Sequence, residues 1–335
     1  MVTFFEVAAQ RKIKSSNQLI KLNQLIDWKK VRGRLKGFHK LEERDQGGQR
    51  PYDSLKMFKA LLLGQWHNLS DTQLEETLVL RVDFMLFTGF DLNEPTPDET
   101  TLCRFRNKLI ANNLHHKLFQ CINRQLQELG LAIESAPGAV LDATVIESAA
   151  RPRRVYEVQE DREEETEDEK LIVKKVESKD PDARWLKKGK KCFFGYKGFI
   201  SATTNTGFIQ HVEVESANVS EVTYLPKMLR QLKQKEIYAD KGYYSQANHE
   251  LLKTEHRKNR VMKKATRGQE LSFWEKHFNK LISKKRYIIE QTFGTLKRRF
   301  KMTRASYITR LKVEGQLYLK SICFNLLKAV RLCEI

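Results

Sequence analysis

The spacing of apolar residues changes near residue 137, and this change limits the possible folds more than any other feature of the chain. Before it, apolar residues recur at the spacing of one helix face, as Leu19, Leu22 and Leu25 do. Residues 138–146 read Gly-Ala-Val-Leu-Asp-Ala-Thr-Val-Ile, an apolar and β-branched run of strand length. The sequence therefore predicts a helical N-terminal region followed by a region that contains a sheet.

The second region alternates between strand and helix patterns. Strand patterns occupy residues 191–203, 208–216, 236–240 and, less clearly, 256–264, whereas helical patterns occupy residues 219–234, 270–299 and 313–332. A turn at Asn205-Thr-Gly207 joins the first two of these later strands as a hairpin. This order of elements is typical of an α/β core, a mixed sheet with flanking helices.

Helix boundaries can be predicted at several points of the first region. Residues 18–45 are predicted as one helix, a second follows at 52–66, and a third begins at Ser70-Asp71. Thr96-Pro97 predicts a further helix, with Thr96 as the cap and the proline in the first position. That helix carries Arg104 and Arg106, which we expect either to recognise DNA or to form a solvated face.

The charge of the chain indicates a polyanionic partner. The formal net charge is +19, and residues 157–169 hold nine acids and one base, so the rest of the chain carries +27. A surplus of this size favours nucleic acid over a merely basic soluble protein, because each neutralised phosphate releases counterions. The acidic run itself is expected to be a solvated, mobile insertion. An alternative is that it occupies the basic DNA groove when DNA is not bound.

Composition also excludes other classes. Five widely spaced cysteines without a Cys-x-x-Cys pair favour reduced thiols in a cytoplasmic protein and disfavour structural zinc. No apolar run approaches the roughly 18–20 residues that span a bilayer, and the first residues do not resemble a signal peptide. The sequence therefore predicts a cytoplasmic protein with no membrane partner.

Three acids stand in contexts that suggest more than a surface role. Asp142 is at the centre of the apolar run 138–146, where an ionised carboxylate is costly unless a cation pairs with it. Asp240 follows Ile237-Tyr-Ala, where a short strand ends. Glu290 lies in a helical stretch, between Arg286 and Lys297. Each alone is commonly a turn residue or a surface ion pair, but the occurrence of all three in one basic chain favours a functional role.

The helix that contains Glu290 has two stripes with the same spacing. One is apolar and predicts a buried face, formed by Ile289, Phe293, Leu296 and Phe300. The neighbouring stripe is polar and consists of Arg286, Glu290, Gly294 and Lys297, in which the glycine would let another backbone approach. This second stripe predicts a functional face beside the core.

These residues resemble motifs of the DDE transposases of bacterial insertion sequences, the insertion-sequence-five-like branch of the insertion-sequence-four type. The matching segments are Leu141-Asp-Ala-Thr144, Asp180-Pro-Asp-Ala-Arg-Trp, Phe194-Gly-Tyr-Lys197, Val214-Glu-Ser-Ala-Asn218 and Tyr238-Ala-Asp-Lys-Gly-Tyr-Tyr244. Arg286, Glu290 and Lys297 fit three members of the family's Tyr–Arg–Glu–Lys signature. Ser283 stands where tyrosine is usual, and Phe199 where histidine is common. The resemblance covers roughly residues 50–330.

The resemblance implies an RNase H-like core, a mixed sheet with flanking helices, preceded by an all-helical domain. The expected division is a helical region for DNA binding and dimerisation at 1–135, a catalytic domain at 136–305 with a charged insertion at 157–182, and a C-terminal helix at 306–335 that packs on the core. Asp142, Asp240 and Glu290 would be the catalytic metal ligands, with Asp142 shared by two Mg²⁺ ions, for which Mn²⁺ substitutes. Two such ions activate the attacking oxygen and stabilise the leaving one.

The same resemblance implies that the partner is double-stranded DNA: the terminal inverted repeats of the element, and target DNA. The expected DNA contacts are Arg286, Lys297, Arg298, Lys241, Lys197, Tyr196, Arg104 and Arg106, although for Tyr196 a packed strand residue is an equal alternative. The implied activity is cleavage at the element ends and joining of the 3′-hydroxyls to target DNA. The assembly would be a homodimer on DNA, because two ends must be held together, in a bacterial cytoplasm and associated with the nucleoid.

Two alternatives remain open from the residues alone. One is a catalytically silent DNA-binding regulator derived from a transposase, which would not need all three acids. The other is a metal-dependent nuclease of the same core that hydrolyses without joining, because the ligand set does not distinguish the two reactions.

Overall fold

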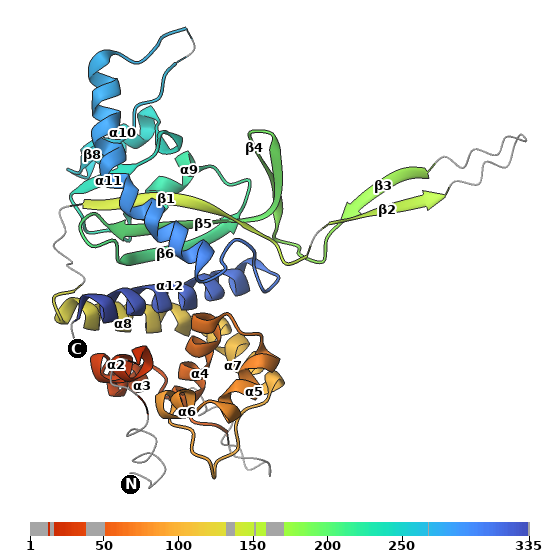
Figure 1. Ribbon diagram of the computed structural model, residues 1–335. Coiled ribbons are helices and arrows are strands. Elements are labelled where there is room, and N and C mark those ends of the chain that lie inside the picture. The colour runs from red at the N-terminus through yellow and green to blue at the C-terminus, as the bar shows by residue number, and fades with distance from the viewer. Residues whose placement is uncertain are drawn as a thin grey trace, which may run out of the picture.

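The computed structural model describes residue 13 and residues 17–37, 51–131, 138–150, 152–158, 171–266 and 268–333, with only the backbone of 153–158 and 171–177. The N-terminal part is helical, as predicted (Figure 1). Its helices are α2 (Gln18–Leu25), α3 (Trp28–Arg34), α4 (Ser54–His67), α5 (Asp71–Leu80), α6 (Val82–Thr88), α7 (Glu99–Ala111) and α8 (Leu114–Glu128).

Two helix boundaries in this part differ from the prediction. The helix predicted from residue 18 is interrupted, because the Asp27 side chain caps α3 by accepting hydrogen bonds from the backbone of Lys29 and Lys30. Likewise α7 begins two residues later than predicted. Its cap is Asp98, which accepts from the backbone N–H of Thr101 at 2.6 Å, and not Thr96. In both places the helix begins where an aspartate side chain can accept hydrogen bonds from the first backbone N–H groups. The spacing of apolar residues does not reveal such a cap.

The sheet is built around β1 (Gly138–Glu147). The other strands are β4 (Arg184–Lys188), β5 (Lys191–Thr203), β6 (Ile209–Ser216), β7 (Glu236–Ala239) and β8 (Lys258–Val261). β1 pairs with β5 antiparallel and with β7 parallel; β6 pairs with β5 antiparallel, and β8 with β7 parallel. The first part of β5 also pairs with β4, a strand that the sequence did not predict. The mixed sheet is therefore as expected.

Each face of the sheet is covered by a different pair of helices. Ala139 and Leu141 pack with α9 (Glu221–Leu229) and α10 (Gln246–Thr254), whereas Val140 and Ile146 belong to the cluster that includes α11 (Phe273–Arg298) and α12 (Arg310–Leu332). This alternation follows from the period of two along a strand. It places Asp142, two residues after Val140, on the side of α11.

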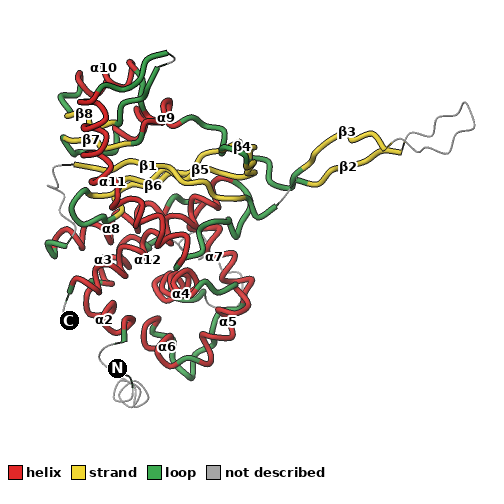
Figure 2. Tube along the Cα trace, turned by 45° about the horizontal axis from the view of Figure 1, so that its top comes forward, coloured by secondary structure: helices red, strands yellow, loops and turns green. Residues whose placement is uncertain are grey.

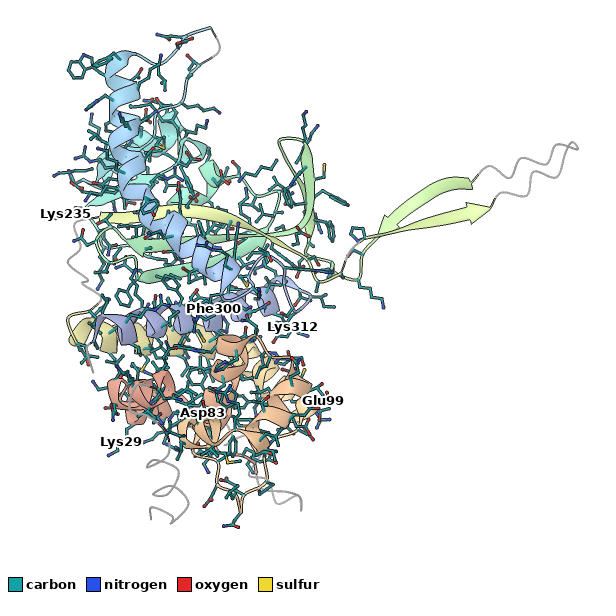
Figure 3. The ribbon with its side chains drawn as sticks, viewed as in Figure 1. Lys29, Asp83, Glu99, Lys235, Phe300 and Lys312 are labelled. Carbon is teal, nitrogen blue, oxygen red and sulfur yellow. The ribbon has the colours of Figure 1, made fainter. Side chains whose placement is uncertain are left out.

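Helix α12 joins the sheet to the N-terminal helices. It packs against β6 on one side and against α8 and α4 on the other, and Figures 1 and 2 show it between these layers. The C-terminal helix was predicted to pack on the core; it also packs on the N-terminal lobe, and one hydrophobic cluster includes residues of both. Phe300 lies at this junction (Figure 3), with its ring 6.4 Å from that of Trp66. Among the described residues no helix is long and apolar enough to cross a membrane.

A two-stranded ribbon projects away from the sheet (Figure 1). It pairs β2 (Arg153–Val158) with β3 (Leu171–Glu177) in antiparallel fashion. The sequence predicted a solvated insertion here and no strands. The apolar β-branched residues on either side of the acidic run, such as Val155 and Ile172-Val173, are too few to give a clear strand pattern beside so many charges. Residues 159–170 lie outside the described residues, so the expected mobility of the acidic run and its contact with the DNA groove stay predictions.

Candidate active site

Asp142 occupies the centre of β1, between two neighbouring strands. Its carboxylate is 19% exposed and accepts a hydrogen bond from the backbone N–H of Ala143 at 2.8 Å. Burial raises the pKa of Asp142, and the guanidinium of Arg286 opposes that rise. Burial therefore disfavours the charged form of this acid, and an adjacent cation such as Arg286, or a divalent metal ion, favours it.

Asp240 is brought beside Asp142 by the register of two parallel strands. Leu141 of β1 is paired with Ala239 of β7. Asp142 directly follows Leu141 and Asp240 directly follows Ala239, so the two aspartates are neighbours across the two strands. Asp240 also caps the short 3₁₀ helix η1 (Lys241–Tyr243) by accepting from the backbone N–H of Lys241 at 2.7 Å. Its side chain is 38% exposed, so the pair has one buried and one open member.

Arg286 connects the two aspartates from α11. Its Nη2 lies 2.8 Å from Oδ2 of Asp142, and its Nη1 lies 3.4 Å from Oδ1 of Asp240. The Arg286 side chain is only 10% exposed. Its predicted contact with DNA is therefore not seen in this arrangement, where Arg286 serves as the counterion of the aspartate pair. Two carboxylates that converge on one cation form a donor set of the kind that divalent metals bind.

Glu290 lies one turn after Arg286 on the same helix and is exposed to solvent. In the described parts of the chain, no three His, Cys, Asp or Glu side chains are placed close enough to hold a metal ion together. The structure therefore brings together two of the three predicted acids. The role of Glu290 as third ligand stays a prediction, which requires its side chain to turn toward the aspartates.

The polar stripe of α11 is only partly as predicted. The apolar stripe is buried at Ile289, Phe293, Leu296 and Phe300. No other backbone of the described chain approaches Gly294, because the atoms nearest to a Cβ at this position belong to the Arg298 side chain, with Nη2 3.3 Å away. Arg298 donates to the Gly294 carbonyl and remains exposed.

Two groups beside the aspartates were not predicted. Tyr243 is fully buried, and its hydroxyl has no hydrogen-bond partner among the described residues. Burial is the main cause that raises the pKa of Tyr243, and the charges of Asp142, Glu221 and Asp240 raise it further. These three acids therefore lie around the tyrosine. The carboxylate of Glu221 lies against η1, so close to Gly242 that a Cβ at that position would come within 2.3 Å of it. The sequence signal for Tyr243 is the Asp-Lys-Gly-Tyr-Tyr motif, in which Asp240 and Lys241 are the predicted site residues.

Two predicted DNA contacts on β5 are buried instead. Tyr196 is 0% exposed, and its hydroxyl donates to Asp180. Lys197 donates to the carbonyl of Val219 at 2.8 Å and forms an ion pair with Glu221 at 3.2 Å, with 8% of its side chain exposed. Both side chains are engaged within the protein in this arrangement, as the packed alternative for Tyr196 expects, and their contacts with DNA stay predictions. The basic candidates that remain exposed or partly exposed are Lys241, Lys297, Arg298 and Arg104.

Arg106, another expected DNA contact, is engaged within the protein instead. Its guanidinium forms two hydrogen bonds of 2.7 Å with the carboxylate of Asp71 and lies 4.3 Å from the ring centre of Tyr307. Only 5% of the side chain is exposed. This ion pair fastens the start of α5 to α7, so Arg106 has a structural role.

We expect Arg106→Ala to lower the free energy of unfolding by about 3 kcal/mol, because it leaves the Asp71 carboxylate without its partner. Arg104→Ala, two residues away on the exposed side, should change it by less than about 0.5 kcal/mol. Urea unfolding of both variants measures the difference. Equal stability of the two variants, with weaker DNA binding by Arg106→Ala alone, would restore the DNA-binding assignment.

The segment Asp180-Pro-Asp182 fastens the sheet to α12. Asp180 is 2% exposed and accepts hydrogen bonds from Ser148 Oγ at 2.5 Å, from the Tyr196 hydroxyl and from the backbone N–H of Thr309 at 3.1 Å. Asp182 accepts from the backbone N–H of Arg310 at 2.8 Å. These acids therefore join the end of β1 and the middle of β5 to the start of α12, and their contacts in this structure are structural.

Comparison with known proteins decides the family. The model of a "Transposase DDE domain" matches residues 135–326, which contain both aspartates, Arg286 and Glu290. The "Transposase for insertion sequence element IS1106" of Neisseria meningitidis serogroup B is 40% identical over 228 residues, 68% of this chain and 76% of that protein. The chain belongs to the DDE transposases of insertion sequences. A second model, "Transposase domain (DUF772)", matches residues 7–108. No solved structure matches the chain significantly.

Family membership confirms two expectations. The mixed sheet with β1 at its centre is the RNase H-like core of a DDE transposase, and the protein is an insertion-sequence transposase that acts on DNA. The convergence of Asp142 and Asp240 lies within the matched domain.

Proposed function

We propose that this transposase cuts phosphodiester bonds at the terminal inverted repeats of its element and joins the resulting 3′-hydroxyls to target DNA. The observation that carries this proposal is the convergence of Asp142 and Asp240 on the single cation of Arg286. One acid comes from a strand centre and the other from the end of the parallel neighbour, so the backbone holds both carboxylates at a fixed separation.

Asp142 and Asp240 would hold divalent metal ions, with Glu290 as a further ligand. Carboxylate oxygens suit Mg²⁺, and Mn²⁺ should substitute for it. Bound there, two such ions would supply Lewis acidity to the attacking and leaving oxygens. The protein contributes the position of Asp142 on β1, and the Arg286 guanidinium, which balances the charge of the pair. Tyr243 adds a buried hydroxyl beside them.

The DNA partner is supported by charge. The formal net charge of +19 favours a polyanion, and Lys241 and Lys297 lie next to the aspartate pair, one directly after Asp240 and the other on α11. Because an insertion sequence has two ends, we further propose that a homodimer forms on DNA, in the bacterial cytoplasm and at the nucleoid. The helices of residues 1–135 would supply DNA binding and pairing.

Incubation with labelled element ends, a target plasmid and Mg²⁺ tests this function. We expect labelled product covalently joined to the plasmid, and loss of all product when a chelator is added. Nicked ends without joined product would indicate a nuclease, and a gel shift without any cut would indicate a regulator. Either result would contradict the proposal.

A further inference from the structure

A basic hairpin that the sequence did not predict meets β1 at its end, where Gly195 is paired with Glu147. It consists of β4 and the first residues of β5, joined at Gly189, whose φ of +62° suits glycine (Figure 1). The hairpin has no acid between residues 184 and 194 and five bases: Arg184, Lys187, Lys188, Lys190 and Lys191. Gly195 ends it, at a point where a Cβ would lie 2.2 Å from the carbonyl oxygen of Ile146, so only glycine lets β5 approach β1 there.

The two faces of this hairpin carry different side chains. Residues directly opposite each other in an antiparallel pair share a face. Trp185 is opposite Phe194, with ring centres 5.2 Å apart, and Lys187 is on that same face. Lys188 is opposite Lys191 and therefore lies on the other face, together with Phe193. Lys187 and Lys188 are thus adjacent, both exposed, and directed to opposite sides.

The face of Lys188 borders a pocket of about 240 Å³ next to Asp142. The pocket is lined by Lys188 and Phe193 of the hairpin, Ala143 and Thr144 of β1, and Phe293 and Lys297 of α11, among others. Along β1, Thr144 is two residues from Asp142 on the same face, a separation of about 7 Å. The pocket is therefore adjacent to the aspartate pair.

The polar groups of this pocket are suited to an anion. The Thr144 side-chain oxygen is buried and has no hydrogen-bond partner in the described chain. Burial and the charge of Lys188 lower the pKa of Lys297, so the two ammonium groups repel each other. Glu147 is the one acid that lines the pocket, and within the described residues it forms no ion pair with either lysine. An anion between the lysines would relieve their repulsion and accept a hydrogen bond from the Thr144 hydroxyl.

We propose that Lys188, Lys297 and Thr144 form a subsite for one backbone phosphate of the DNA, close to the bond that is cut. The hairpin thereby acts as an arm that holds the strand against the aspartate pair. This inference rests on the proposed function, since the phosphate belongs to the same DNA end. It adds the hairpin lysine and the β1 threonine to the residues that position the substrate.

Cleavage of a labelled duplex from the element terminus, in Mg²⁺, tests the subsite. Lys188→Ala should cut about tenfold more slowly, the effect of losing one charged hydrogen bond, and Lys188→Arg should restore most of the rate. Lys187→Ala is the matched control and should stay within about twofold of the wild type, because it removes the same charge from the opposite face.

A methylphosphonate scan identifies the phosphate itself. Each phosphate within three nucleotides of the cut is replaced in turn by an uncharged methylphosphonate. One replacement should slow the wild type about tenfold and should not slow Lys188→Ala any further, since both changes remove the same contact. The proposal is overturned if Lys188→Ala cuts as fast as Lys187→Ala, or if every replacement slows both proteins equally. Failure of the wild type to cut any end would instead overturn the proposed function, and this subsite with it.

Discussion

Asp142→Asn should reduce DNA cleavage and joining by at least about 10³-fold and leave binding of the element ends unchanged. The amide keeps the shape of the carboxylate but loses the charge that a divalent metal requires. Of the two aspartates, Asp142 has the more buried carboxylate and makes the shorter contact with Arg286. Its replacement should therefore reduce activity more than any other single change. Cleavage rates and gel-shift affinities on labelled ends measure the two effects separately.

Asp240→Asn and Glu290→Gln should show the same pattern. Gln291→Ala is a matched control for Glu290, because it alters the next exposed residue of α11, and it should keep nearly full activity. Full activity of Glu290→Gln in Mg²⁺ would remove Glu290 from the site and leave the aspartate pair. Loss of end binding in all three acid variants would mean that the acids maintain the structure rather than the chemistry.

Asp180→Ala should lower the free energy of unfolding by about 3–5 kcal/mol, the second large effect that we expect. The change leaves the hydroxyls of Ser148 and Tyr196 without their acceptor inside the protein, and each unsatisfied buried donor costs about 1–3 kcal/mol. It also removes the acceptor for the backbone N–H of Thr309, just before α12. Urea unfolding followed by circular dichroism gives the change.

Asp182→Ala is the control for this effect. Asp182 is partly exposed and accepts one backbone hydrogen bond, from Arg310, so its removal should cost only about 1 kcal/mol, as for a helix cap. If Asp180→Ala were as stable as Asp182→Ala, then the network between β1, β5 and α12 would not stabilise the fold.

Much of the architecture could be predicted because it depends on local patterns. The alternation in β1, the turn at 205–207 and the apolar stripe of α11 each follow from neighbouring residues. The predictions failed where two signals overlapped. Charged residues are uncommon in strands, so a segment rich in them is not predicted as a strand. For this reason the lysine-rich β4 and the strands on either side of the acidic run were not predicted.

The functional residues show the limit of sequence more clearly. Asp142 and Asp240 could be predicted, since an acid within or directly after an apolar strand is unusual in itself. The position of Arg286 depends on Asp142, 144 residues earlier, and the burial of Arg106 depends on Asp71, 35 residues earlier. A basic residue that binds DNA and one that pairs with a distant acid have the same local sequence, so the ion pairs of Arg106 with Asp71 and of Lys197 with Glu221 could not be predicted.

The variant Asp142→Cys shows whether Asp142 holds a metal ion that is used in DNA cleavage. A thiolate binds Mg²⁺ poorly and the softer Mn²⁺ better. We predict that this variant does not cut labelled ends with Mg²⁺ and regains cutting with Mn²⁺, whereas the wild type cuts with both. Cutting by Asp142→Cys at the wild-type rate in Mg²⁺, or cutting by the wild type in excess chelator, would contradict the account.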